Sequence, residues 1–139
     1  MKLIDAINEV DNLKPNMYGL TDKIKWLSRL DQRIFEQIIL THELSEEERA
    51  PFLEDSLGPL IDGDLVFVGY DENDQDKELI VHEPYDEIYT HWLSAQIDWN
   101  NREFIGFNSS NAMFEATYGA FRNAFNQTHM PKSARKRYF

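Results

Sequence analysis

The feature that most constrains this chain is a row of aromatic side chains at helical spacing in its C-terminal half. The rings recur at alternating steps of three and four residues, with a single gap at Asn111, and they comprise Phe104, Phe107, Phe114, Tyr118, Phe121 and Phe125. Such steps place every ring on one side of an α-helix. Because each ring buries about 150–250 Å² when it is enclosed, the row offers more apolar surface than one short helix covers. We therefore predict that these rings form the core of a helical bundle, with or without a surplus for contacts between subunits.

Helical periodicity also runs through the N-terminal part of the chain. Apolar residues at helical steps predict one helix over residues 2–13 and a second that begins after Thr21 and Asp22 and ends near residue 42. Ser45 precedes three glutamates, a pattern typical of a helix start, but the prolines and the glycine that follow limit this region to a turn or two of helix. We expect the helices of this part to lie within residues 1–57.

Residues 84–127 form the longest predicted helical segment. Pro84 stands where a first helical residue would, and an apolar face follows it to Trp99. The apolar face changes phase before Phe104, and the polar residues 108–111 are of the type that caps a new helix. We predict a long helix with a bend or break at 108–111, and the alternative is an antiparallel helix pair.

Two β-rich runs, residues 65–70 and 78–82, flank the hydrophilic stretch 71–76. This order predicts one small β-hairpin within residues 62–83. A two-stranded ribbon is marginal alone, so it must pack on the helices. The predicted fold class is therefore mainly α: a single-domain helical bundle with a long C-terminal helix or helix pair, one small β-hairpin and a tail at 128–139.

Residues that carry catalysis or bind metals are sparse. The chain has no cysteine, and none of its four histidines has a zinc-binding spacing. Residues 71–76 resemble a calcium loop only in their alternation, because the glycine and glutamate positions of such a loop hold other residues. A metal-dependent hydrolase built on Glu54, Asp62 and Asp64 is an alternative that we rank last. We predict a non-enzymatic protein with no metal and no cofactor.

The charge is large and unevenly distributed. The chain has 25 acidic and 14 basic residues and a net charge of −11, which argues against broad nucleic-acid binding. The chain has no apolar run of the ~20 residues that a membrane span needs, and we expect a soluble protein without an export signal.

The basic residues gather in a tail that follows an acidic body. Residues 132–139 carry a charge of +4, and the residues before them carry −15. We predict that four cations guide this tail onto an acidic surface of a partner and that two rings anchor it in an apolar pocket. These partner-binding residues are Lys132, Arg135, Lys136, Arg137, Tyr138 and Phe139. The alternatives are a solubilising end and a weak contact to nucleic acid.

A further pattern extends over about two-thirds of the chain. It comprises residues 84–89, Leu93, 96–98, Glu103, 107–109, 113–114, Tyr118, Phe121 and 126–131, together with 13–16 and 25–31. In this order of residues the chain resembles a family of small structural proteins of tailed bacteriophages and prophages. The resemblance implies a mainly helical virion component, and above all a head-to-tail connector (adaptor) that forms a ring beneath the portal.

Two functional hypotheses of different classes follow. The first is a virion assembly protein that forms a homo-oligomeric ring of about a dozen copies and binds a portal or a neighbouring neck or tail protein, with acidic faces that keep DNA from adhering to the channel. This protein would be assembled in the host bacterial cytoplasm and would bind neither a membrane nor a specific nucleic-acid sequence. The alternative is a soluble phage or bacterial binding or regulatory module that acts as a monomer or dimer through its helical face.

Overall fold

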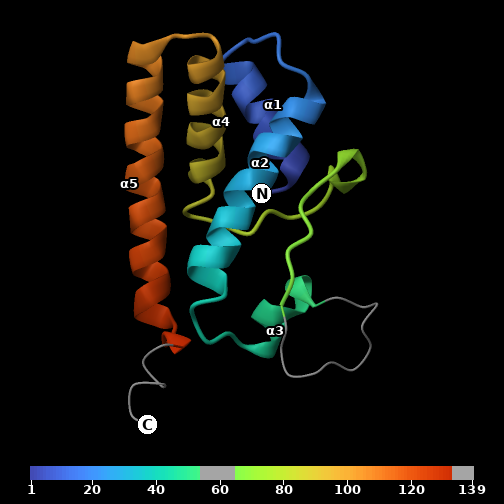
Figure 1. Ribbon diagram of the computed structural model, residues 1–139, viewed down its shortest axis with the longest axis vertical. Coiled ribbons are helices and arrows are strands. Elements are labelled where there is room, and N and C mark those ends of the chain that lie inside the picture. The colour runs from blue at the N-terminus through green and yellow to red at the C-terminus, as the bar shows by residue number, and fades with distance from the viewer. Residues whose placement is uncertain (54–64, 133–139) are drawn as a thin grey trace.

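The computed structural model describes residues 1–53 and 65–132, and this part of the chain is mainly helical (Figure 1). It contains the α-helices α1 (Leu3–Leu13), α2 (Leu20–Ile34), α3 (Glu46–Arg49), α4 (Glu87–Asn100) and α5 (Phe104–Thr128). A π-helix, η1 (Phe35–Ile39), continues α2, and two short 3₁₀ turns are η2 (Ala50–Phe52) and η5 (Glu72–Asp74). The predicted helical bundle is confirmed for the described residues, in which no helix is both long and apolar enough to span a membrane.

The core lies between α1, α2 and α4, and α5 runs antiparallel to α4 along one edge of the bundle (Figure 1). The apolar stripes read from the sequence are the buried faces of α1 and α2. The largest fully buried apolar side chains come from the long helices and from residue 79, and they include Leu3, Val10, Leu27, Leu30, Ile34, Leu79, Ile88, Leu93, Ile97 and Phe114.

The predicted bend at 108–111 is wrong, and the alternative of an antiparallel helix pair is what forms. The chain reverses at residues 101–103, where Arg102 has a φ of 60°. The buried carboxylate of Asp98 stabilises this reversal: Lys14 Nζ donates to both of its oxygens, at 2.5 and 2.6 Å, and Ser110 Oγ donates at 3.2 Å. Ser110 therefore lies inside α5, where its hydroxyl donates to the buried acid, and it does not begin a new helix.

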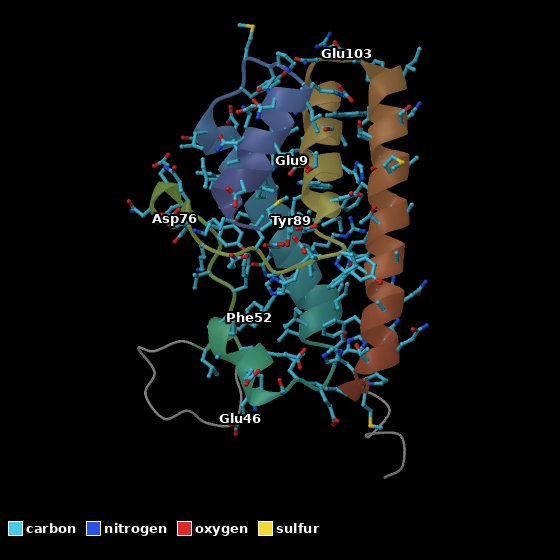
Figure 2. The ribbon with its side chains drawn as sticks, turned by 180° about the vertical axis from the view of Figure 1, so that it is seen from behind. Glu9, Glu46, Phe52, Asp76, Tyr89 and Glu103 are labelled. Atoms are coloured by element: carbon cyan, nitrogen blue, oxygen red, sulfur yellow. The ribbon has the colours of Figure 1, made fainter. Side chains whose placement is uncertain are left out.

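Gly106 lets α5 pack closely on this carboxylate. A Cβ atom at residue 106 would lie 3.0 Å from Asp98 Oδ2, which is closer than ordinary van der Waals contact. The turn between α4 and α5, which Glu103 marks in Figure 2, is thus fixed by one buried acid and the small residue opposite it.

The predicted β-hairpin is also wrong, since the described residues contain no strand. The main-chain groups of the two β-rich runs are bonded to other parts of the molecule. Leu3 N–H donates to the Lys77 carbonyl and Leu79 N–H to the Met1 carbonyl, while Tyr70 N–H donates to Ser28 Oγ. Because buried amides need acceptors but not any particular kind, these contacts replace a strand ladder.

The aromatic row is divided along α5. Phe114 and Tyr118 are buried in the core, and Phe107, Phe121 and Phe125 are partly buried. Phe104 is 55% exposed and rests its edge on Trp99 at the turn. Only the middle of the row is therefore core, and its C-terminal part lines a pocket.

Candidate functional site

A pocket of about 500 Å³ lies where the C-terminal part of α5 meets α3, η2 and the segment 66–85. A volume of this size is in the range of ligand pockets in proteins. Its walls are mainly apolar, and the largest rings and aliphatic groups in them belong to Phe52, Phe67, Leu79, Tyr85, Phe121 and Phe125. Phe52, on η2, is labelled beside α3 in Figure 2.

Four exposed glutamates line this mainly apolar pocket: Glu47, Glu48, Glu78 and Glu83. Two of them have a nitrogen close by, since Glu48 lies 2.5 Å from His129 Nε2 and Glu78 lies 3.0 Å from the Met1 amino group. Within residues 1–53 and 65–132, Glu47 and Glu83 form no ion pair. We call these four residues the acidic rim, and its field favours a cationic ligand.

Local capping sets the position of part of the acidic rim. Ser45 Oγ accepts from Glu48 N–H and the Glu48 carboxylate accepts from Ser45 N–H, the reciprocal capping box expected at a helix start. Partial burial raises the pKa of Glu48, but these bonds and the contact with His129 outweigh it and leave that pKa below its usual value. Glu48 is therefore held ionised beside the pocket at neutral pH.

The inner wall of the pocket is tied to the core by one buried carboxylate, Asp31 on α2. Tyr70 OH donates to Asp31 Oδ2, Tyr89 OH donates to Oδ1 at 2.7 Å, and Ile80 N–H donates to Oδ2 at 3.2 Å. Tyr89, which Figure 2 labels inside the bundle, also accepts from Val81 N–H at 2.7 Å. Because Tyr70 and Ile80 line the pocket, Asp31 fixes the shape of that wall.

Burial governs the acid–base behaviour of this group. Desolvation raises the pKa of Asp31 to about 6, against the lowering effect of its three hydrogen bonds. Burial, and then the charge of Asp31, raises the pKa of Tyr70 and of Tyr89, so both phenols stay protonated donors. Asp31 has no exposed surface, and it therefore positions the wall but does not touch a ligand.

This raised pKa predicts a stability change with pH. A carboxyl with a folded-state pKa of about 6 and an unfolded value of 3.8 adds a proton-linked stabilisation, which is complete below pH 4 and is lost as the pH rises through 6. The hydrogen bonds that its oxygens accept are a separate contribution. The difference in free energy of unfolding between wild type and Asp31→Asn should therefore fall by about 2 kcal/mol from pH 4 to pH 7. Urea unfolding of both proteins across this range measures it, and a constant difference would contradict the raised pKa.

A second cluster holds the chain where the tail begins. His42 Nε2 lies 2.6 Å from Asn126 Oδ1, and the rings of Phe125 and His129 stack at 3.8 Å. Glu43 N–H then donates to the Met130 carbonyl, and Lys132 N–H donates to the Thr41 carbonyl. These two bonds flank an antiparallel bridge between His42 and Pro131 and fix the direction in which the chain leaves the bundle.

A second surface of interest is the side of α5 that faces away from α4. Its residues are exposed, carry no charge and are mostly small: Ile105, Ser109, Ala112, Met113, Ala116, Ala120 and Asn123. Ile105 is 87% exposed. The charged residues of α5 are Glu115 and Arg122, which lie seven residues apart on its flank. We call this uncharged surface the outer face of α5.

The structure separates the residues that the sequence singled out. Phe121 and Phe125 line the pocket, Phe114 and Tyr118 are in the core, and Lys132 is exposed just after the bridge. The tail residues Arg135, Lys136, Arg137, Tyr138 and Phe139 lie outside the described residues, as do Glu54, Asp62 and Asp64 of the hydrolase hypothesis. Across the part that is described, no three acidic or histidine side chains gather as metal ligands, and the acids of 71–76 include Asp71 and Asp74, which cap η5.

Sequence reasoning missed the acidic rim and the Asp31 network. Asp31 had a usable signal, since it lies four residues after Leu27 and three before Ile34, on the apolar stripe of α2. An acid in such a place is buried only if donors surround it. The acidic rim gave no signal as a whole, because Glu47 and Glu48 are distant in sequence from Glu78 and Glu83.

The comparisons with known proteins add no relative to this description. No family model, curated protein or solved structure matches the chain. The interpretation of its function therefore rests on the pocket, the outer face of α5 and the residue pattern itself.

Proposed function

We propose that this protein is a non-enzymatic virion assembly protein of a tailed bacteriophage, a head-to-tail connector that forms a homo-oligomeric ring on the portal. The observation that carries the proposal is the outer face of α5, a long exposed helical surface without charge in a chain that is 28% charged. The resemblance to phage structural proteins supplies the biological setting.

The outer face is suited to a second helix. Small side chains such as Ala112, Ala116 and Ala120 let two helix axes approach to the usual 8–10 Å without a clash. Interfaces are depleted in charge at their centre, as this face is. At one edge of the bundle α5 has α4 on one side only (Figure 1), so a copy of the protein can pack on its free side.

The charge of the whole molecule fits a ring around DNA. The acidic residues outnumber the basic ones by 11, so carboxylates would line much of a channel built from copies of this chain. Phosphates are repelled by such a lining, and DNA passes without adhering. The basic tail is left as the segment that contacts a partner.

Placing a charge on the outer face should abolish self-association. We expect Ala116→Glu to convert the oligomer to a monomer of 16.4 kDa with little change in melting temperature, because alanine and glutamate are both good helix formers. Ala50→Glu is the matched control, since this alanine is exposed outside α5 and its substitution should leave the oligomer intact. Light scattering gives the mass, and electron microscopy of the wild type shows whether rings form.

Absence of rings, with or without a portal protein, would contradict the connector. The pocket favours one alternative, a soluble phage or bacterial binding module that captures a partner as a monomer or dimer. That module would keep its monomeric or dimeric mass in the presence of a portal protein. The mass of the mixture therefore separates the two functions.

A further inference from the structure

We propose that the pocket bounded by the acidic rim is the receptor for the basic tail, residues 133–139, of a neighbouring copy of this same chain. This inference rests on the proposed self-association and names the contact that joins adjacent copies. Two complementary halves of one chain carry it: a described pocket with excess negative charge, and a segment with excess positive charge and two rings.

The charges of the tail and of the rim are opposite in sign. The tail with Lys132 carries +4 and no acid, and the rim carries four carboxylates beside one lysine, Lys77. Glu47 and Glu83 form no ion pair in the part of the chain that the structure describes, so they are open to cations from outside. Paired charges of this kind speed the encounter and fix the register.

The apolar parts match as well. Tyr138 and Phe139 are large rings at the end of a segment that is otherwise basic and small. The pocket offers aromatic walls from Phe52, Phe67 and Phe121. Rings pack edge to face or offset on such walls, and this contact is not screened by salt.

The pairing of residues 130–132 with 41–43 fixes where the tail leaves the bundle. In the antiparallel pairing, Met130 lies opposite Glu43 and Lys132 opposite Thr41, so the chain runs back toward residue 41. Ile39, Leu44 and Thr128 line the pocket on both sides of this pairing. The seven further residues of the tail span up to ~25 Å, so the proposal requires a neighbour's pocket within that distance, and the chain's own pocket is the competing site that the dilute double-cysteine chain tests.

Site-specific cross-linking tests this contact directly, because the chain has no cysteine of its own. One full-length chain carries Val68→Cys, at a pocket residue that is 79% exposed, and another carries Phe139→Cys, which leaves Tyr138 and all four cations in place. Mixed under mild oxidation, they should form a disulfide-linked heterodimer. Met17→Cys is the control, since Met17 is 99% exposed and does not line the pocket.

Charge-reversal variants test the electrostatic part of the contact. Glu47→Lys in the Val68→Cys chain should slow cross-linking about tenfold at ~0.1 M salt, where screening limits the reach of a charge to about 10 Å, and Glu46→Lys, one residue away on α3 and outside the pocket lining, should slow it less. In Figure 2 Glu46 points outward from α3. Combining Glu47→Lys with Arg135→Glu and Arg137→Glu in the tail should recover most of the lost rate.

Three results would overturn the proposal. The first is that the Phe139→Cys chain cross-links to the Met17→Cys chain as fast as to the Val68→Cys chain. The second is that no heterodimer forms at all. The third is that a dilute chain with both Val68→Cys and Phe139→Cys forms an internal disulfide. The same cross-link tested in the Ala116→Glu background keeps the two ideas apart. A heterodimer that still forms in the Ala116→Glu background supports the tail contact, even if the ring-shaped oligomer expected from the outer face of α5 is never seen.

Discussion

Phe114→Ala should lower the free energy of unfolding by about 3–5 kcal/mol, the range for deleting a fully enclosed ring. Phe114 has no exposed surface and contacts the rings of Trp92, 5.0 Å away between centroids, and of Tyr118, 5.9 Å away. The guanidinium of Arg33 also lies 5.9 Å from its centre. The cavity left by alanine would lie between α4 and α5, at the middle of their contact. Chemical denaturation followed by circular dichroism measures the loss.

Phe104→Ala is the matched control on the same helix. Its ring is over half exposed and leans on Trp99, so its removal creates no cavity and should cost about 1 kcal/mol or less. Equal losses for the two variants would mean that burial along α5 is uniform, contrary to the structure.

Asp31→Ala should destabilise the protein by about 3–5 kcal/mol at neutral pH, because it removes the shared acceptor of a buried network. The hydroxyls of Tyr70 and Tyr89 and the amide of Ile80 would each lose the oxygen to which they donate. Each buried donor without an acceptor costs about 1–3 kcal/mol. The inner wall of the pocket should loosen together with the fold, and thermal unfolding and tyrosine fluorescence report the two effects.

Two further substitutions serve as controls for Asp31→Ala. Asp31→Asn retains one acceptor oxygen and should cost clearly less than alanine does. Asp76→Ala removes an exposed acid, labelled at the tip of the 71–76 loop in Figure 2, and should leave stability within about 0.5 kcal/mol of wild type. Similar losses for Asp31→Ala and Asp76→Ala would show that the network contributes nothing.

Much of the helical architecture could be predicted because it is written in local spacing. The stripes of α1 and α2 and the cap at Ser45 depend on residues three or four positions apart. The course of residues 65–81 could not, because its main-chain donors bond to side chains of α2 and α4, and two of these, Ser28 and Asp31, lie 42 and 49 residues from their donors. β-rich composition predicts an extended backbone, but it does not name the partner of that backbone.

The position of the reversal between α4 and α5 could not be predicted, for a similar reason. The polar residues 108–111 have the composition of a cap, yet the ion pair between Lys14 and Asp98, 84 residues apart, sets the turn at 101–103. The tail was recognisable from composition alone, as a contrast between a basic end and an acidic body. The pocket that we assign to it was not, since its walls come together only when α3, α5 and the segment 66–85 meet.

The internal carboxylate of Asp31 also has a consequence for how this protein can diversify. Because the course of the main chain at Tyr70 and Ile80 is set from inside the bundle, exposed side chains around the pocket, such as Val68 and Lys77, are not needed to hold its shape. Substitutions at such exposed positions should therefore change what the pocket presents to a partner and leave the shape of the cavity intact. One binding preference could be exchanged for another by surface substitutions alone, without any intermediate variant that fails to fold.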